Sequence, residues 1–130
     1  MFQNSLSVAM MEKSASALWR RQQVILHNVA NEDTPGYKAK RLEFESALRR
    51  ELHAGTPRVS AISGSALQRV ERQAPIVYED NSTIGRADGN NVNILNEQIE
   101  MARTQIQYNA LLQRISGHYA TLKYVISGGR

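Results

Sequence analysis

The sequence predicts a mainly α protein, with long N- and C-terminal helices that pair as a coiled-coil domain, a short third helix and a loop-rich, flexible middle. Two observations predict this class. Leu, Ile and Val lie mainly toward the two ends, and neither Pro nor Gly occurs in residues 6–30 or 93–116. The aromatic fraction is only 6%. This composition favours seams between helices over a thick globular centre.

The first element is a helix over residues 6–30, within an N-terminal coiled-coil region 1–31. Its apolar stripe has the alternating three- and four-residue spacing of a helix: Val8, Met11, Ala15, Leu18, Ile25 and Val29. Trp19, Leu26 and Ala30 widen that stripe. A helix of this length extends roughly 38 Å at 1.5 Å per residue. It therefore needs a long partner helix, from this chain or from another.

A firm stop follows the helix. Asn31 tolerates the left-handed conformation in which many helices end. Pro35 and Gly36 suit the second and third positions of a type II turn, and Tyr37 is a large ring that could pin the redirected chain to its neighbour. With a short helix predicted over residues 42–53, this turn forms a second region, 32–57.

The middle region, 58–91, differs in kind. It is rich in Ser, Gly, Asn and Asp, with a short strand predicted at residues 75–79 and turn-forming residues from 80 to 91. We expect a flexible stretch without a stable core.

The last region, 92–130, predicts the second long helix, with Asn93 as its N-cap. One apolar stripe comprises Leu95, Ile99, Ala102, Ile106 and Ala110. Another, about half a turn away, comprises Tyr108, Leu111, Leu112, Ile115, Tyr119, Leu122 and Ile126. One face can pack on the first helix, which leaves the other for a neighbouring molecule. The sequence therefore predicts assembly.

Charge gives little evidence for nucleic-acid binding. The formal net charge is +4, but it is spread along the chain and the basic pairs lie among glutamates. Solvated helix faces are the favoured interpretation, and a small basic nucleic-acid-binding module is the alternative. The N-terminus lacks a basic region followed by an apolar run, so neither a cleaved signal peptide nor a membrane span is expected.

Enzymatic signals are missing. The chain has no cysteine, and His27, His53 and His118 are scattered without ligand spacing. Glu97 and Glu100 suit a solvated face near a helix N-terminus. No phosphate-binding loop, nucleophile elbow or calcium loop occurs. We therefore expect no enzyme, no cofactor and no metal.

Two motifs stand out. The first is the turn signature ANxxTPGY, carried by Asn28, Ala30, Asn31, Thr34, Pro35, Gly36 and Tyr37. It resembles the signature of one known family, the bacterial flagellar axial proteins of rod and hook. The second precedes the C-terminal helix and is carried by Asp88, Gly89, Asn91 and Asn93. It resembles the C-terminal half of the proximal rod proteins, although Asn93 replaces an aspartate and Leu95 an acidic residue. The similarity covers residues 5–53 and 84–127.

The resemblance implies a structural subunit of the proximal rod, the drive shaft that crosses the periplasm around an export channel. Its implied partners are other rod proteins, the basal-body ring and export gate, copies of itself and the flagellar type III export apparatus. Of the two proximal rod subunits, the C-type sister remains the alternative. The residues expected to form the coiled coil and its assembly contacts are Val8, Met11, Leu18, Ile25, Val29, Ile99, Ala102, Ile106, Tyr108, Leu112, Ile115, Tyr119 and Leu122.

Overall fold

The computed structural model describes residues 2–53, 65–82 and 85–128, with side chains placed for 6–50, 68–82 and 85–128. Its elements, in chain order, are α1 (Phe2–Ala30), β1 (Lys40–Glu43), α2 (Glu45–His53), α3 (Ser65–Arg72), β2 (Ile76–Glu79) and α4 (Ile94–Ile126). The mainly helical class with two long terminal helices is confirmed.

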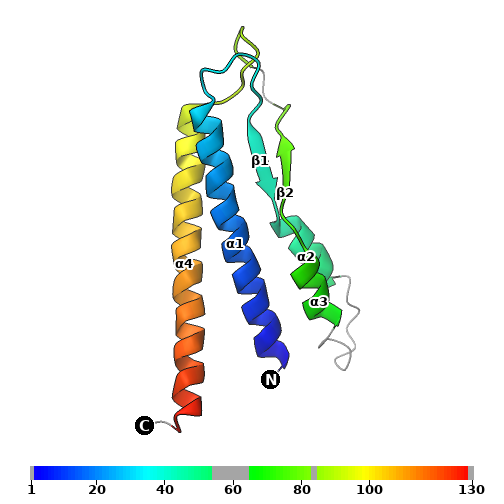
Figure 1. The fold of residues 1–130 in the computed structure, drawn as a ribbon, viewed down its shortest axis with the longest axis vertical. Coiled ribbons are helices and arrows are strands. Elements are labelled where there is room, and N and C mark those ends of the chain that lie inside the picture. Colours follow the sequence, from blue (N-terminus) through cyan, green and yellow to red (C-terminus); the bar gives the residue numbers. More distant parts are fainter. Residues whose placement is uncertain (1, 54–64, 83–84, 129–130) are drawn as a thin grey trace.

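The elements form an elongated molecule in which α1 lies in the middle (Figure 1). On one side α1 packs against α4, which runs antiparallel to it. On the other side it contacts β1 and α3. The turn after α1 and the segment before α4 meet at one end, and both chain termini lie toward the other.

The seam between α1 and α4 follows a heptad spacing. Apart from Glu100, the less exposed residues of α4 recur at intervals of three and four: Ile94, Glu97, Met101, Thr104, Tyr108, Leu111, Ile115, His118 and Leu122. This is the periodicity of a coiled-coil seam. Its two fully buried members, Glu97 and Thr104, are polar. Near the turn, the fully buried positions of α4 are therefore polar rather than apolar.

A small apolar core lies on the other side of α1. It contains Ala17, Leu42, Phe44, Leu48 and Val70, with Leu6, Met10 and Val24 packed against it. Full burial of one such large side chain contributes about 1.5–3 kcal/mol. The core attaches α2 and α3 to the middle of α1.

The predicted helix over residues 42–53 is wrong at its start. Residues 40–43 form β1, which pairs antiparallel with β2 so that Leu42 lies opposite Val77. The four-residue spacing of Phe44 and Leu48 is helical, and α2 begins between them at Glu45. Leu42 is buried as a strand residue instead, because β1 lies along α1.

The middle region has more structure than predicted. The predicted strand is confirmed as β2. However, α3 was not predicted, and its Val70 is only 1% exposed, so the expectation of no stable core is wrong at this point. A helix of eight residues has little intrinsic stability, and packing against α1 and α2 provides it. Residues 58–64 lie outside the described part of the chain.

Candidate functional site

The stretch that ends α1 forms a tight turn. The backbone N–H of Tyr37 donates to the carbonyl oxygen of Thr34 at 3.2 Å, and Gly36 has φ +71°. These features match the predicted type II turn. The helix ends at Ala30, directly before Asn31, as predicted, but the left-handed conformation expected of Asn31 is wrong, since no described residue other than glycine has a positive φ. Asn31 instead donates from its side chain to the carbonyl oxygen of His27 at 2.7 Å.

The segment before α4 is hydrogen-bonded to this turn. The N–H of Gly36 donates to the carbonyl oxygen of Asp88 at 2.9 Å, and Lys38 Nζ donates to that of Gly89 at 2.8 Å. Gly89 also has a positive φ of +84°, and a Cβ there would lie 3.4 Å from the Cα of Gly36. We call the two segments, residues 28–41 and 86–97, the clasp.

Asn90 joins the two halves of the clasp. Its side chain is fully buried, and its Nδ2 lies 2.7–2.9 Å from three carbonyl oxygens just beyond α1, those of Asn31, Glu32 and Thr34. Its Oδ1 accepts from the N–H of Val92 at 2.8 Å. One buried amide group thus ties the segment before α4 to three carbonyl oxygens of the turn that follows α1. Sequence reasoning did not select Asn90, because a short Asn-rich segment predicts a turn without showing what it binds.

Asn28 makes an equivalent link inside α1. It is fully buried, accepts at Oδ1 from the N–H of Lys40 at 2.8 Å, and donates from Nδ2 to the carbonyl oxygen of Lys40 at 2.8 Å. The same Nδ2 donates to Glu97 Oε2 at 3.0 Å. Asn28 therefore holds the start of β1 against α1 and reaches α4 at the same time.

Glu97 corrects the prediction of a solvated face. Its side chain is 0% exposed, and Oε1 accepts from Arg41 Nη1 at 2.6 Å while Oε2 accepts from Asn28. Arg41 also lies 3.5 Å from Asp80. Glu100, three residues on, does pair with exposed Arg103 at 3.0 Å as a surface residue would. The buried carboxylate is tolerated because it has both a charged and a neutral donor.

The other side chains of the motif before α4 form hydrogen bonds with backbone groups. Asp88 Oδ1 accepts from the N–H of Asn90 at 3.1 Å. Asn91 accepts from the N–H of Ala39 at 2.7 Å and donates to the carbonyl oxygen of Asp80 at 2.6 Å, so it reaches the ends of both strands. Asn93 is the N-cap of α4, and its side chain accepts from the N–H of Asn96 at 3.2 Å.

Tyr37 closes the clasp on the side of α1. Its hydroxyl lies 2.8 Å from His27 Nδ1 and 3.2 Å from Asn28 Oδ1. Burial, followed by the charges of Glu97 and Glu79, raises the pKa of the Tyr37 hydroxyl. The hydroxyl therefore stays protonated and able to donate. The remaining signature residues Ala30, Thr34 and Pro35 are exposed.

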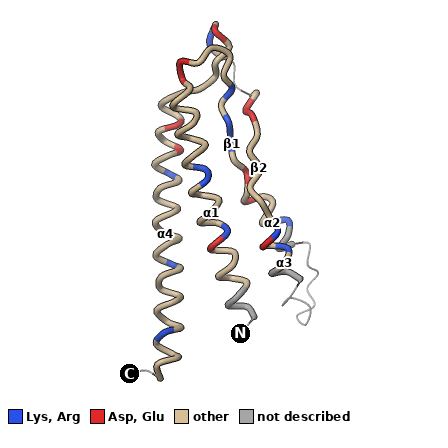
Figure 2. Tube along the Cα trace, viewed as in Figure 1, with Lys and Arg blue, Asp and Glu red and all other residues tan. Residues whose placement is uncertain are grey.

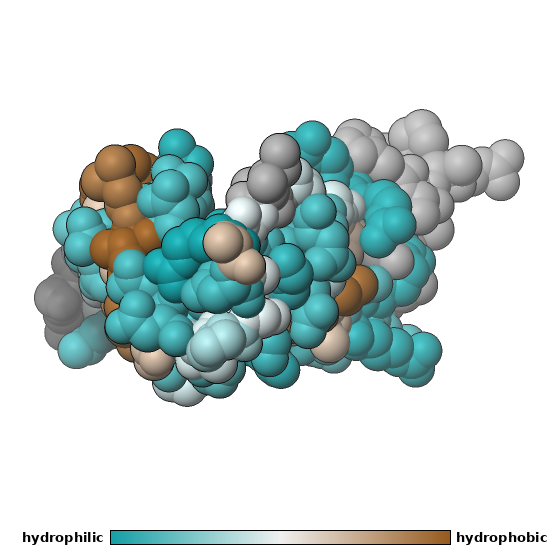
Figure 3. Space-filling model, turned by 90° about the horizontal axis from the view of Figure 1, so that it is seen from above, coloured by the Kyte–Doolittle hydropathy of each residue, from teal (hydrophilic) through white to brown (hydrophobic). Residues whose placement is uncertain are grey.

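The predicted coiled-coil residues separate into three groups. Leu18 and Ile25 are buried, whereas Val8, Met11, Tyr108, Ile115 and Leu122 are half-buried. Val29, Ile99, Ala102, Ile106, Leu112 and Tyr119 are exposed. Val29 is 37% exposed, and the buried position beside it on α1 is Asn28. The stripe through Ile99 and Ile106 faces outward, and Figure 3 shows hydrophobic surface on the side where α4 lies.

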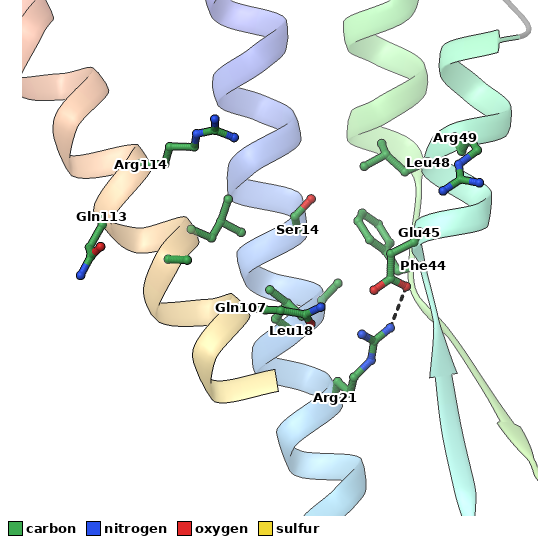
Figure 4. A pocket seen from close by; sticks show the side chains of 13 residues that line it. Ser14, Leu18, Arg21, Phe44, Glu45, Leu48, Arg49, Gln107, Gln113 and Arg114 are labelled. Carbon is green, nitrogen blue, oxygen red and sulfur yellow. Dashed lines mark hydrogen bonds and ion pairs between the residues drawn. The ribbon is translucent and has the colours of Figure 1, made fainter. Parts of the chain in front are cut away.

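A groove lies along α1 between α4 and the layer of β1 and α2. Its larger part has a volume of about 820 Å³ and contains Leu18 of α1, Leu48 of α2 and Leu111 of α4 (Figure 4). Its smaller part, about 430 Å³, reaches toward the clasp between Ile99 and Tyr78. Arg21 lines both parts, and its ion pair with Glu45 at 2.7 Å lowers the pKa of that carboxyl.

The described residues offer no group of three or more His, Asp or Glu side chains that could hold a metal. In the same part of the chain, no helix has both the length and the apolar character required to cross a membrane.

The relatives found by comparison with known proteins share one name, flagellar basal body rod protein FlgB. No protein-family model matches the chain. The chain is 34% identical over 124 residues to the flagellar basal body rod protein FlgB of Bacillus subtilis (strain 168), with 92% of each chain covered. It is 32% identical over 117 residues to the FlgB of Escherichia coli (strain K12), covering 85% of each. With the FlgB of Cereibacter sphaeroides (strain ATCC 17023) it shares 32% over 107 residues, covering 79% of this chain and 83% of the relative.

Proposed function

The chain belongs to the FlgB family of flagellar basal body rod proteins, and we propose that it is a structural subunit of the proximal rod. In this role it polymerises through its terminal helices into the drive shaft around the export channel and catalyses no reaction. The observation that carries the proposal is the similarity to FlgB along nearly the whole length, 92% of both chains for the relative from Bacillus subtilis.

The surface of the helix pair supports assembly. Large apolar side chains are exposed on both helices, including Trp19 and Leu26 of α1 and Leu95 and Ile106 of α4, which are 52–70% exposed. Exposed apolar surface along paired helices is typical of a site that neighbours cover. The partners proposed are further copies, other rod proteins, and the basal-body ring and export gate. The proposed route is type III export without a cleaved signal peptide.

The clasp has a defined role in this proposal. It fixes the direction in which β1 and α2 leave the helix pair, because Asn28, Asn90 and Glu97 each join two or more segments there. Neighbouring subunits would then meet the same surface on every copy. We place the assembly unit in residues 1–31 and 92–130, with the signature turn as its closed end.

Deletion of the gene in a motile strain tests the function. The expected result is a cell that lacks hook and filament, does not swim, and retains the membrane-embedded export base seen in isolated basal bodies. Complementation by the same gene on a plasmid should restore swimming. A deletion strain that swims normally would contradict the proposal.

A further inference from the structure

The groove along α1 is long enough to bind a helix. On its α4 side the lining residues run from Asn96 to Arg114, a span of roughly 27 Å at 1.5 Å per residue. Arg21 lines both parts, so they adjoin along α1. Six of the thirteen residues that line the larger part are apolar, including Ala17, Phe44 and Ala110, and they come from three helices or their flanks. An apolar channel between helices is a common way to bind an amphipathic helix.

The charges around the groove are predominantly positive. Its lining includes five cations, Arg21, Lys40, Arg41, Arg49 and Arg114, and two carboxylates, Glu45 and Glu100. Both carboxylates are already paired, with Arg21 at 2.7 Å and Arg103 at 3.0 Å. In the part of the chain that the structure describes, Lys40, Arg49 and Arg114 form no ion pair. The groove therefore presents unpaired positive charge beside its apolar seat.

A helix from a second copy does not match this charge. Cations exceed carboxylates by two in α1 and by one in α3 and in α4, and the numbers are equal in α2. Figure 2 shows how few acidic residues the two long helices carry beyond the clasp. None of the helices in the described residues carries a net negative charge, so binding a helix of a second copy would bring like charges together.

We infer that the groove is a docking site for an acidic amphipathic helix of a different protein, whose apolar stripe packs in the larger part while flanking carboxylates pair with Arg49 and Arg114. This inference rests on the proposed function only for its setting, the flagellar basal body, and the binding itself is independent of it. Arg49 on α2 and Arg114 on α4 lie on opposite sides of the groove, so carboxylates on both edges of the incoming helix would be engaged (Figure 4).

Calorimetric titration of the full chain tests the inference with two synthetic 18-residue peptides. They share one Leu and Ala stripe and a lactam-stabilised helix, and differ only in carrying Glu or Lys beside the stripe. The Glu peptide should bind at least about tenfold more tightly, with an affinity that falls as salt is added. Exchanging both rim cations, Arg49→Glu with Arg114→Glu, should reverse the preference. Equal affinity for the two peptides would overturn the inference.

Two tryptophan substitutions on α4 locate the binding. Ala110 lines the groove and Ala102 does not, although both are exposed positions of the same helix. Ala110→Trp should reduce affinity for the Glu peptide at least about tenfold, and Ala102→Trp should leave it unchanged, with equal helix content by circular dichroism. Equal loss in both variants would contradict the groove. Self-association that Ala110→Trp abolishes, without binding of either peptide, would assign the groove to a second copy and overturn the inference.

These results are separable from the test of function. A non-motile deletion strain together with a chain that binds neither peptide would retain the rod assignment and remove the docking site. A motile deletion strain together with groove-dependent binding of the Glu peptide would retain the docking site and remove the rod assignment.

Discussion

The two ends of the α1–α4 pair are built differently. At the clasp, Asn28, Asn90 and Glu97 are 0% exposed, and each has hydrogen-bond partners within the chain. At the other end, Val125 and Ile126 of α4 are 68% and 83% exposed. The clasp end thus has its buried polar groups satisfied within the chain, whereas the C-terminal end of α4 carries large apolar side chains that are mostly exposed.

The difference follows from what each kind of surface costs when it lacks partners. A buried polar group without a hydrogen bond costs about 1–3 kcal/mol, so the clasp has to be satisfied before a neighbour arrives. Apolar side chains at the far end can stay exposed to water in the isolated chain. In the proposed assembly, each Å² of apolar surface that a neighbour covers would contribute roughly 25 cal/mol. We therefore expect the clasp to set the shape of the chain, and the exposed apolar side chains to serve association in the proposed rod.

Breaking the clasp at Asn90 should have the largest effect. Asn90→Ala removes the donor to three carbonyl oxygens and the acceptor for Val92, so we expect a loss of about 3 kcal/mol in the free energy of unfolding. Denaturant unfolding followed by circular dichroism measures it. Asn81→Ala, at an exposed asparagine, is the control and should change stability by less than about 0.5 kcal/mol. Equal effects of the two substitutions would show that the clasp is not held by Asn90.

The buried carboxylate comes next. Glu97→Gln places a neutral amide against Arg41 in place of a carboxylate, and we expect the free energy of unfolding to fall by about 2 kcal/mol. The loss is limited because Arg41 keeps its contact with Asp80. Glu100→Gln, one turn along the same helix, breaks only a surface pair and should cost less than about 0.5 kcal/mol. Thermal unfolding of both variants provides the comparison. A larger loss of stability in Glu100→Gln than in Glu97→Gln would contradict the importance of the buried carboxylate.

The turn itself should be less sensitive. At Gly36, φ is +71° and a Cβ would meet no atom within 4 Å, so Gly36→Val costs only backbone strain, on the order of 1–2 kcal/mol. We expect rod assembly to be impaired more than export of the subunit, as measured by comparing secreted and basal-body-bound protein. Loss of export before assembly would instead make the turn an export signal.

Gly117→Ala, in α4 with open space around it, should stabilise the chain by about 0.5–1 kcal/mol.

The smallest effect on stability is expected at the far end. Ile126→Ser exchanges a side chain that is 83% exposed, so the free energy of unfolding should change by less than about 0.5 kcal/mol. The same variant should reduce the swimming halo of a complemented deletion strain, because the removed apolar surface is used in assembly. A destabilisation above about 1 kcal/mol with normal swimming would show that this end packs within the subunit.

Local signals in the sequence predicted much of the fold. The periodicity of the apolar residues predicted both long helices, Pro35 and Gly36 predicted the turn, and Asn93 predicted the cap of α4. Residues 75–79 predicted β2. Each of these depends on backbone preferences or on residues a few positions apart, which a single sequence contains.

Tertiary packing decided the rest. Asn28 and Glu97 are 69 positions apart, and nothing near either residue shows that they meet in a buried pair. Leu42 belongs to a strand because it pairs with Val77, and α3 exists because Val70 is buried against other elements. The sequence by itself determined where α1 ends and where α4 begins, since the turn and cap signals at those two points are local. Which polar groups are buried, and which apolar face stays exposed, depended on partners that only the folded chain brings together.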